Sequence, residues 1–222
     1  MRIPEFFAEI EAILNSGSKR TIIGIVGKPG AGKSTVGEEI SKRFKYPEVS
    51  TLSMDGYHLS NEELLALGRL DRKGAPDTFD SKGFTELIRS LRTQGSEAIR
   101  FPIFHREIEA SIADEGIIEA EARVIIVEGN YLLASDHGWG EVRKLLDKTF
   151  FINIDDHLRR DRLIARHIQY GKTPEEAKAW SLGSDEANAA YIELTREHAS
   201  DFLEIDLGNF GSKLQPPLGD VA

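Results

Sequence analysis

The residues best suited to chemistry form a glycine-rich octapeptide, Gly27–Ser34, which fits the pattern G-x-x-x-x-G-K-[ST] at every fixed position. Glycine lets such a loop fold around a phosphate group with its backbone N–H groups pointing inward. Lys33 would bring a positive charge to the β- and γ-phosphates, and the Ser34 hydroxyl would ligate Mg²⁺. The pattern therefore predicts a nucleoside triphosphate site. Its predicted residues are Gly27, Lys28, Pro29, Gly30, Ala31, Gly32, Lys33, Ser34 and Thr35.

The segments on either side of the octapeptide support this prediction. The apolar run Thr21–Val26 is typical of a buried strand, and the pattern Val36–Phe44 is typical of a helix. A helix that begins at the phosphates adds the positive end of its dipole to the site. An ordinary glycine-rich turn would need neither flank, so we favour phosphate binding.

Two acidic residues follow other strand-like runs. Asp55 follows Val49–Met54, where a carboxylate can touch Mg²⁺ or accept a proton from an attacking hydroxyl. Glu128 ends the run Val124–Glu128, and an acid in that place can hold Mg²⁺ directly or through water. The simpler alternatives are an Asp-Gly turn and a polar strand end. In the company of the phosphate loop, we favour a chemical role for both acids.

A group of arginines lies in the helical pattern 156–170. Arg159, Arg162 and Arg166 have the spacing i, i+3, i+7 and therefore share one helix face. Arginine can stabilise the charge that develops on a phosphoryl group during transfer. For any single arginine, pairing with a neighbouring aspartate is the simpler explanation. From the group as a whole, we expect a lid that supplies at least one catalytic arginine.

The long segment between the second and third strand-like runs has few strand signals. Insertions of this size in a compact domain are usually functional, so we expect it to cover the strand ends and bind the acceptor. His105 and Arg106 could bind acceptor oxygens, although a structural hydrogen bond is the commoner fate of a single histidine. Asn130 could orient a substrate or cap a turn, and Asp80 fits a helix N-cap. The candidate acceptor-binding residues are Asp55, Tyr57, His58, His105, Arg106 and Asn130.

Strand-like runs and helical patterns alternate along the chain, which is typical of a parallel sheet covered by helices on both faces. We predict one α/β domain over residues 1–222, with an insertion at 56–120 and a lid at 156–184. The predicted strands are Thr21–Val26, Val49–Met54, Val124–Glu128, Thr149–Ile154 and Phe202–Leu207. The predicted helices are Glu5–Leu14, Ser34–Phe44, Gly83–Thr93, Val142–Asp147, Leu158–Tyr170, Pro174–Trp180 and Glu186–His198.

The composition excludes several classes of function. The net charge of −9 argues against non-specific nucleic-acid binding, which needs an excess of cations. The chain has no cysteine and therefore no disulfide, thiol nucleophile or cysteine zinc site. Because no apolar run approaches the length of a membrane span and the N-terminus lacks a signal-peptide core, we expect a cytoplasmic protein without membrane partners.

Four segments together resemble the uridine kinase, phosphoribulokinase and bacterial pantothenate kinase family: Gly27–Ser34, Met54–His58, Arg72–Asp80 and Val127–Leu133. Within that family the chain is most similar to a bacterial branch of nucleoside- and nucleotide-kinase-like proteins, some of which are called fructokinases. The resemblance extends from Thr21 to Leu207. The loop is specific for phosphate, whereas the other segments are much less specific for the acceptor.

The resemblance implies a P-loop kinase fold with three layers, a five-stranded parallel sheet, a helical lid and an acceptor-site insertion. It implies ATP as the phosphoryl donor together with Mg²⁺. By the same resemblance Asp55 is the base, Glu128 and Ser34 hold the metal, and Lys33 with Arg162 or Arg166 acts on the phosphates. His105 stands where this branch would have an acid, which indicates a different or relaxed acceptor.

We therefore predict a small-molecule kinase that transfers the γ-phosphoryl group of ATP to a hydroxyl, with a fructokinase-like sugar as the first expectation. A nucleoside or pantothenate is the alternative acceptor. From other functional classes, a non-catalytic nucleotide-binding or ATPase module stays open, whereas a regulatory GTPase would carry an N-K-x-D motif that is absent. The expected partners are a small-molecule acceptor and, by family habit, a second copy of the chain in a homodimer.

Overall fold

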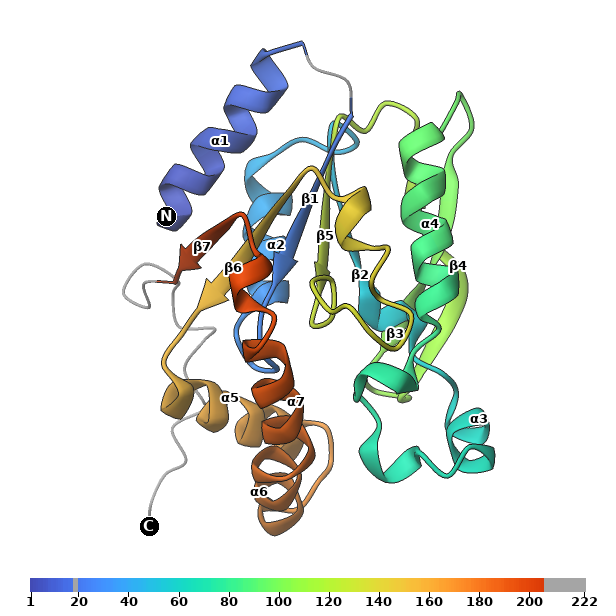
Figure 1. Cartoon of the computed structure of the whole chain (residues 1–222), viewed down its shortest axis with the longest axis vertical. Helices are drawn as coiled ribbons and strands as arrows, with labels where there is room; N and C mark the ends of the chain where they lie inside the picture. The colour runs from blue at the N-terminus through green and yellow to red at the C-terminus, as the bar shows by residue number, and fades with distance from the viewer. Residues whose placement is uncertain (18–19, 206–222) are drawn as a thin grey trace.

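A computed structural model describes residues 1–17 and 20–205 of the chain. Its centre is a parallel five-stranded sheet with the order β2-β5-β1-β6-β7 (Figure 1). Within the described ranges, no helix is both long and apolar enough to cross a membrane. The strands are β1 (Thr21–Val26), β2 (Val49–Ser53), β5 (Val124–Gly129), β6 (Lys148–Asn153) and β7 (Asp201–Glu204).

Helices cover both faces of this sheet, which confirms the predicted three-layer α/β fold. In β1, Ile23 and Ile25 face a core shared with α1 (Ile3–Asn15) and α2 (Lys33–Arg43). Ile22 and Val26 belong to the opposite core, which contains α4 (Ser81–Thr93) and the end of α7 (Ser184–Glu193). Because side chains alternate along a strand and both faces are buried, β1 is apolar almost throughout.

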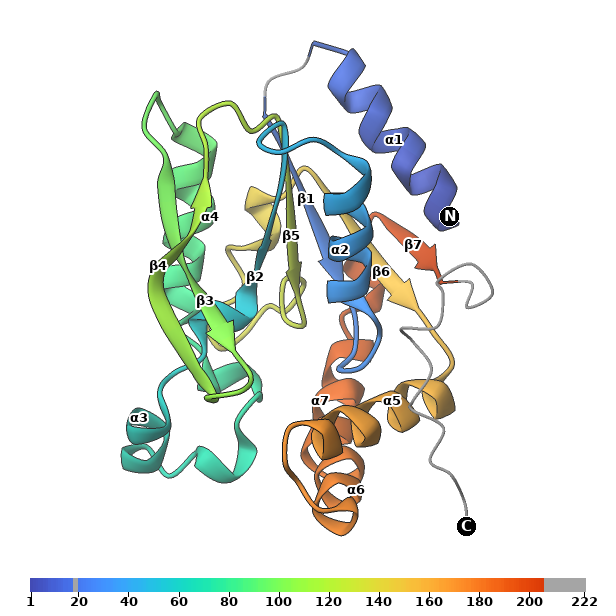
Figure 2. The same ribbon diagram turned by 180° about the vertical axis from the view of Figure 1, so that it is seen from behind.

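The segment between β2 and β5 contains an antiparallel hairpin that the sequence did not predict. The hairpin consists of β3 (Ile99–His105) and β4 (Ala110–Ile118), and it forms a separate two-stranded sheet beside α4 (Figure 2). The hairpin passes directly over the turn that follows β2. The two backbones are so close that a Cβ atom on Gly56 would lie 1.9 Å from the carbonyl oxygen of Pro102. Only a residue without a side chain leaves room here, so Gly56 allows the insertion to pack against the carboxyl end of β2.

Several element boundaries differ from the predictions. Residues 142–147, predicted as a helix, form only the 3₁₀ turn Arg143–Leu145, because the Asp147 N–H donates to the carbonyl of Ile22 and draws the chain toward β1. The predicted helix Glu186–His198 divides into α7 and the 3₁₀ turn Arg196–His198. The short helix α3 (Asn61–Ala66) was not predicted. Leu207, the predicted end of the last strand, lies outside the described residues.

The predicted lid region contains two helices, α5 (Asp156–Gln169) and α6 (Pro174–Leu182). Asp155 caps α5, since its carboxylate accepts hydrogen bonds from the N–H groups of His157 and Leu158. Thr173 and Glu176 form a capping box at the start of α6. The helices α5, α6 and α7 lie together below the carboxyl ends of β1 and β6 (Figure 1).

Candidate active site

The phosphate-binding pattern forms the turn between β1 and α2, with strand, loop and helix arranged as predicted. Gly30 and Gly32 have φ angles of +79° and +95°, in the left-handed region that favours glycine. Gly32 is the N-cap residue of α2. The Ala31 N–H donates to the carbonyl of Lys28 at 3.0 Å, which closes the turn. The loop therefore has the backbone conformation that an anion site at a helix N-terminus requires.

Lys33 lies at the centre of the charged groups of the site. Its Nζ donates to the carbonyl oxygens of Gly27 at 2.9 Å and Lys28 at 3.3 Å. Burial lowers the pKa of Lys33 to about 8, while the nearby acids Glu128 and Asp55 act in the opposite direction. An ammonium that is buried among its own loop carbonyls is well placed to bind a phosphate oxygen.

Glu128 and Ser34 contact each other across the gap between β5 and α2. The Ser34 hydroxyl donates to Glu128 Oε1 at 3.1 Å. Glu128 Oε2 is buried and has no hydrogen-bond partner in the described part of the chain. Burial, assisted by the charge of Asp55, raises the pKa of Glu128 to about 7. A carboxylate with an unpaired buried oxygen beside a serine hydroxyl fits the oxygen donor set that Mg²⁺ prefers.

Asp55 follows β2 and is held in an ionised state by the insertion. Its backbone N–H donates to Ser53 Oγ at 3.2 Å, and its Oδ2 accepts a hydrogen bond from Arg106 Nη2 at 2.6 Å. Burial on its own would raise the pKa of Asp55, but Arg106, His58 and Lys33 outweigh it and hold the pKa below its ordinary value. The carboxylate is therefore available as a proton acceptor near neutral pH.

An aromatic group stands beside Asp55. The imidazole of His58 lies between the rings of Phe79, at 4.0 Å, and Phe104, at 4.7 Å. His58 Nδ1 is 2.8 Å from the carbonyl oxygen of Asp55, and burial lowers the pKa of the imidazole. Sequence analysis did not identify the two phenylalanines. Their only signal is their position in the segments that contain Asp80 and Arg106.

The other candidate acceptor residues have different surroundings. The Tyr57 ring packs edge-on against Phe84, with ring centroids 5.3 Å apart. His105 is hydrogen-bonded to Glu115 across the hairpin. The Asn130 N–H donates to the sulfur of Met54 at 3.1 Å. The structure thus brings Asp55, His58 and Arg106 together. Tyr57 and His105 have partners elsewhere. The predicted acceptor roles of Tyr57, His105 and Asn130 stay predictions.

The structure divides the arginines of α5 into two groups. Arg159 is fully buried and binds Asp156 and Glu186, and Arg160 also binds Glu186. Arg162 instead has three buried guanidinium nitrogens, none of which has a hydrogen-bond partner among the residues that the structure describes. A Cβ atom on Gly32 would lie only 3.8 Å from Arg162 Nη1, so this guanidinium faces the phosphate loop.

Arg166, one turn further along α5, lies among the other charges of the site. Burial lowers its pKa, the nearby Arg106 lowers it further, and Asp185 and Asp55 act in the opposite direction. Within the described ranges, no hydrogen bond or ion pair to the Arg166 guanidinium is found. Arg162 and Arg166 are therefore the two arginines of this helix that remain available to an anion.

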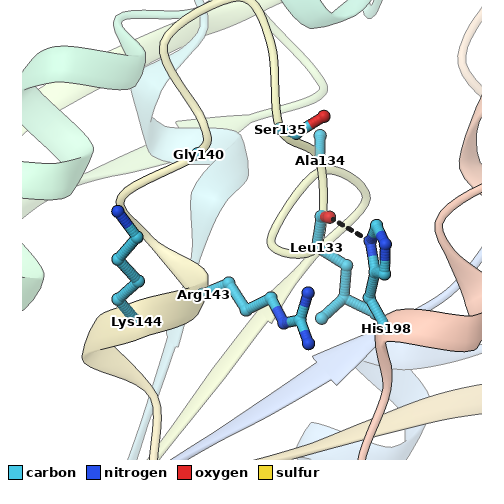
Figure 3. Close-up of a pocket in the computed structure, with 7 residues that line it drawn as sticks. All are labelled: Leu133, Ala134, Ser135, Gly140, Arg143, Lys144 and His198. Carbon is cyan, nitrogen blue, oxygen red and sulfur yellow. Dashed lines mark hydrogen bonds between the residues drawn. The ribbon is translucent and has the colours of Figure 1, made fainter.

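Two hollows in the surface share no residue with the site described above. One, of about 330 Å³, lies among Leu133, Ala134, Ser135, Gly140, Arg143, Lys144 and His198 (Figure 3). In it the side chain of Arg143 extends toward His198, whose Nδ1 is 3.3 Å from the Leu133 carbonyl oxygen. The other, of about 470 Å³, lies between Asp71 of the insertion and Trp180 of α6.

Comparisons with known proteins find kinases, as a phosphate-binding loop next to acidic strand ends would suggest. The model of the "Phosphoribulokinase / Uridine kinase family" matches residues 22–202. A "Putative uridine kinase" of Schizosaccharomyces pombe is 32% identical over 185 residues, which cover 79% of this chain and 79% of that protein. A uridine kinase of Clostridium novyi is 30% identical over 182 residues, which cover 80% of this chain and 84% of that protein.

A solved structure shows the same similarity. The crystal structure of a "putative fructose transport system kinase" from Silicibacter sp. TM1040 has a TM-score of 0.81 and 32% sequence identity. The similarity covers 91% of this chain and 98% of that one.

Proposed function

The chain belongs to the phosphoribulokinase/uridine kinase family of P-loop kinases, which phosphorylate hydroxyl groups and use ATP with Mg²⁺, and from this premise we propose that it phosphorylates a small sugar. For the transfer of a phosphoryl group, the observation that carries the proposal is the ion pair between Asp55 and Arg106, beside Lys33 and Glu128. A base, a phosphate-binding lysine and a metal-binding acid are thus within one cluster. These are the groups that phosphoryl transfer to a hydroxyl requires.

In the proposed mechanism, Asp55 accepts the proton of the acceptor hydroxyl as the oxygen attacks the γ-phosphorus. The bond between the γ-phosphorus and the oxygen that bridges it to the β-phosphate breaks, and ADP leaves. Arg106 keeps the Asp55 carboxylate ionised until that step. The Lys33 ammonium and the guanidinium groups of Arg162 and Arg166 offset the negative charge on the phosphoryl oxygens. The left-handed glycines allow the loop N–H groups to surround the phosphates.

Ser34 and Glu128 are the residues that would hold Mg²⁺, since Glu128 Oε2 is buried and has no hydrogen-bond partner among the residues that the structure describes. The ion, when bound, neutralises charge on the β- and γ-phosphates and helps to align them. The Ser34 hydroxyl donates to Glu128 Oε1, so the two side chains lie close enough to offer oxygen atoms to the same ion.

A sugar is the acceptor that we propose first, because the similar structure from Silicibacter bears the name of a fructose transport system kinase and aligns with nearly the whole chain. Arg106 and His58 supply hydrogen-bonding groups next to Asp55, and Phe79 and Phe104 supply apolar faces. Such a mixture suits a polyol that has both hydroxyl groups and C–H faces.

A nucleoside is the second candidate, because relatives at 30–32% identity bear the name uridine kinase. The same phenylalanine rings could stack on a pyrimidine. Pantothenate remains a third acceptor to test, since it also presents a primary hydroxyl group.

The test is ADP release with purified protein, Mg²⁺ and ATP in the presence of fructose, uridine, pantothenate or glycerate. Phosphorylated fructose, identified by mass and by ³¹P NMR, would support the proposal. A product from uridine or pantothenate alone would replace the sugar with that acceptor. ADP release that no acceptor increases, together with tight ATP binding, would instead indicate a nucleotide-binding or ATPase module.

A further inference from the structure

The phosphate loop holds a second lysine, Lys28, whose contacts differ from those of Lys33. The Lys28 side chain is 11% exposed, and its Nζ lies 2.7 Å from Asp156 Oδ1 and 3.2 Å from Glu193 Oε2. Asp156 is the first residue of α5, and Glu193 is the last residue of α7. One buried ammonium therefore connects the loop to two helices that are far from it in sequence.

Arg159 strengthens the same connection. Its Nε donates to Asp156 Oδ1 at 2.9 Å, the oxygen that Lys28 also contacts. Its Nη2 donates to Glu186 Oε2 at 2.6 Å, and its Nη1 donates to the carbonyl of Pro29 at 3.4 Å. The adjacent residues Lys28 and Pro29 are thus both bound to the first turns of α5.

Direct packing accompanies these charged contacts. A Cβ atom on Gly30 would lie 2.7 Å from the carbonyl oxygen of Arg159 and 2.8 Å from Cγ of Leu163. The loop therefore touches the α5 backbone itself. Arg162, on the same face of α5 as Arg159, lies near Gly32 with its buried guanidinium unpaired in the described ranges.

Two roles are conceivable for the Lys28 charge. As a phosphate ligand, Lys28 would have to break its short contacts to two carboxylates that already balance the charge of its largely buried ammonium. As an anchor, it keeps these contacts when a nucleotide binds. The short distance to Asp156 and the acid shared with Arg159 favour the second role.

We propose that Lys28 is a positioning residue, which holds loop 27–34 on α5 and α7 and so keeps Arg162 beside the phosphates, and that it is not itself a phosphate ligand. The proposal rests on the proposed function only in taking a nucleotide as the ligand of the loop. It assigns different roles to the two lysines of one short motif: Lys33 contacts the ligand, whereas Lys28 shapes the loop.

The first experiment measures amide hydrogen exchange in residues 27–34 and in the first turns of α5, without nucleotide. In Lys28→Met these amides should exchange about tenfold faster or more, because the anchor is lost. The matched control is Lys45→Met, which removes an exposed lysine without a side-chain partner in the described ranges and should change neither region. Unchanged exchange in Lys28→Met would overturn the proposal.

The second experiment measures ATP affinity by calorimetry, without an acceptor. Lys28→Met should weaken ATP binding about tenfold. The double variant Asp156→Asn/Glu193→Gln decides between the two roles. An anchor predicts that it also weakens binding, and that adding Lys28→Met to it costs little more. A phosphate ligand predicts the opposite sign, because the freed lysine and the loss of two negative charges would tighten binding, and that result would overturn the proposal.

The two experiments separate this proposal from the proposed function. If the wild-type protein bound no ATP, the proposed function would fail, while the exchange measurement would still test the anchor. If the double acid variant did not fold, Lys28→Met alone would decide: weaker ATP binding with unchanged loop exchange would indicate a direct charge role and contradict the anchor.

Discussion

Arg106 Nη2 lies 2.6 Å from Asp55 Oδ2, and this ion pair joins the residue that follows β3 to the residues that follow β2. The insertion hairpin thus contributes a charge to the end of the central sheet. Both side chains are only partly exposed, at 33% for Arg106 and 26% for Asp55, so solvent screens the pair less than it screens a surface salt bridge. The pair keeps Asp55 ionised, and the same contact fixes the direction of its carboxylate.

Asp55→Asn should abolish most turnover and leave ATP binding nearly unchanged. The amide keeps the shape of the carboxylate but cannot accept the acceptor's proton, and removing a general base typically costs about 10²–10⁴ in rate. The measurement is kcat for the acceptor that the screen identifies, together with ATP affinity by calorimetry. Glu97→Gln, the same change at an exposed position, is the control. Turnover close to wild type in Asp55→Asn would remove Asp55 from the mechanism.

Arg106→Met should move the acid limb of the kcat/KM profile to higher pH. Burial tends to raise the pKa of Asp55, and Arg106 is the strongest of the charges that lower it. Without the guanidinium, burial is less opposed and the pKa of Asp55 rises. A base must be ionised, so activity should be lost at pH values where the wild type is still active.

The control for this prediction is Arg106→Lys, which keeps the positive charge and should keep the acid limb closer to that of the wild type. A lower rate with an unchanged pH profile in Arg106→Met would instead mean that Arg106 contacts the acceptor without tuning Asp55.

Three strands of the central sheet, β1, β5 and β6, could be predicted from the sequence because each contains a run of buried apolar residues. The hairpin could not be predicted, because the middle of β4 is exposed and carries Asp114 and Glu115, so the strand has no apolar run. The hydrogen bond between His105 and Glu115 could not be predicted either, because it depends on this hairpin. Glu115 lies ten residues from His105, and only the pairing of β3 with β4 brings the two together.

The arginines of α5 show a second limit of the sequence. Their spacing correctly predicted a common face for Arg159, Arg162 and Arg166 but could not separate their roles. The separation depends on Glu186, which lies in another helix and binds Arg159 and Arg160. Charge partners that far apart in sequence are visible only once the helices are packed.

Glu128→Gln should raise the Mg²⁺ concentration needed for half-maximal activity by about tenfold, since an amide is neutral and a weaker ligand for a hard cation. Saturating Mg²⁺ should recover part of the rate, because Ser34 and the phosphates still supply oxygen ligands. The measurement is initial rate against free Mg²⁺ at fixed ATP, with Glu97→Gln as the control. An unchanged Mg²⁺ dependence would contradict the metal role of Glu128.

Arg162→Met and Arg159→Met should have opposite effects on stability and activity. Arg159 is fully buried and bound to Asp156 and Glu186, so Arg159→Met removes its hydrogen bonds to both carboxylates and should destabilise the fold by about 1–3 kcal/mol. The Arg162 nitrogens are buried and have no partners among residues 1–17 and 20–205, so Arg162→Met removes a desolvated charge and should leave the free energy of unfolding unchanged or raise it.

Turnover should follow the reverse order. Arg162→Met should lower kcat about 10²-fold or more, because a guanidinium near the phosphates is lost. The measurements are urea unfolding and kcat for both variants. Arg160→Met is the control for an α5 arginine that has a partner but is more exposed, and it should cost less stability than Arg159→Met. Strong destabilisation by Arg162→Met would mean that its guanidinium supports the fold and does not wait for an anion.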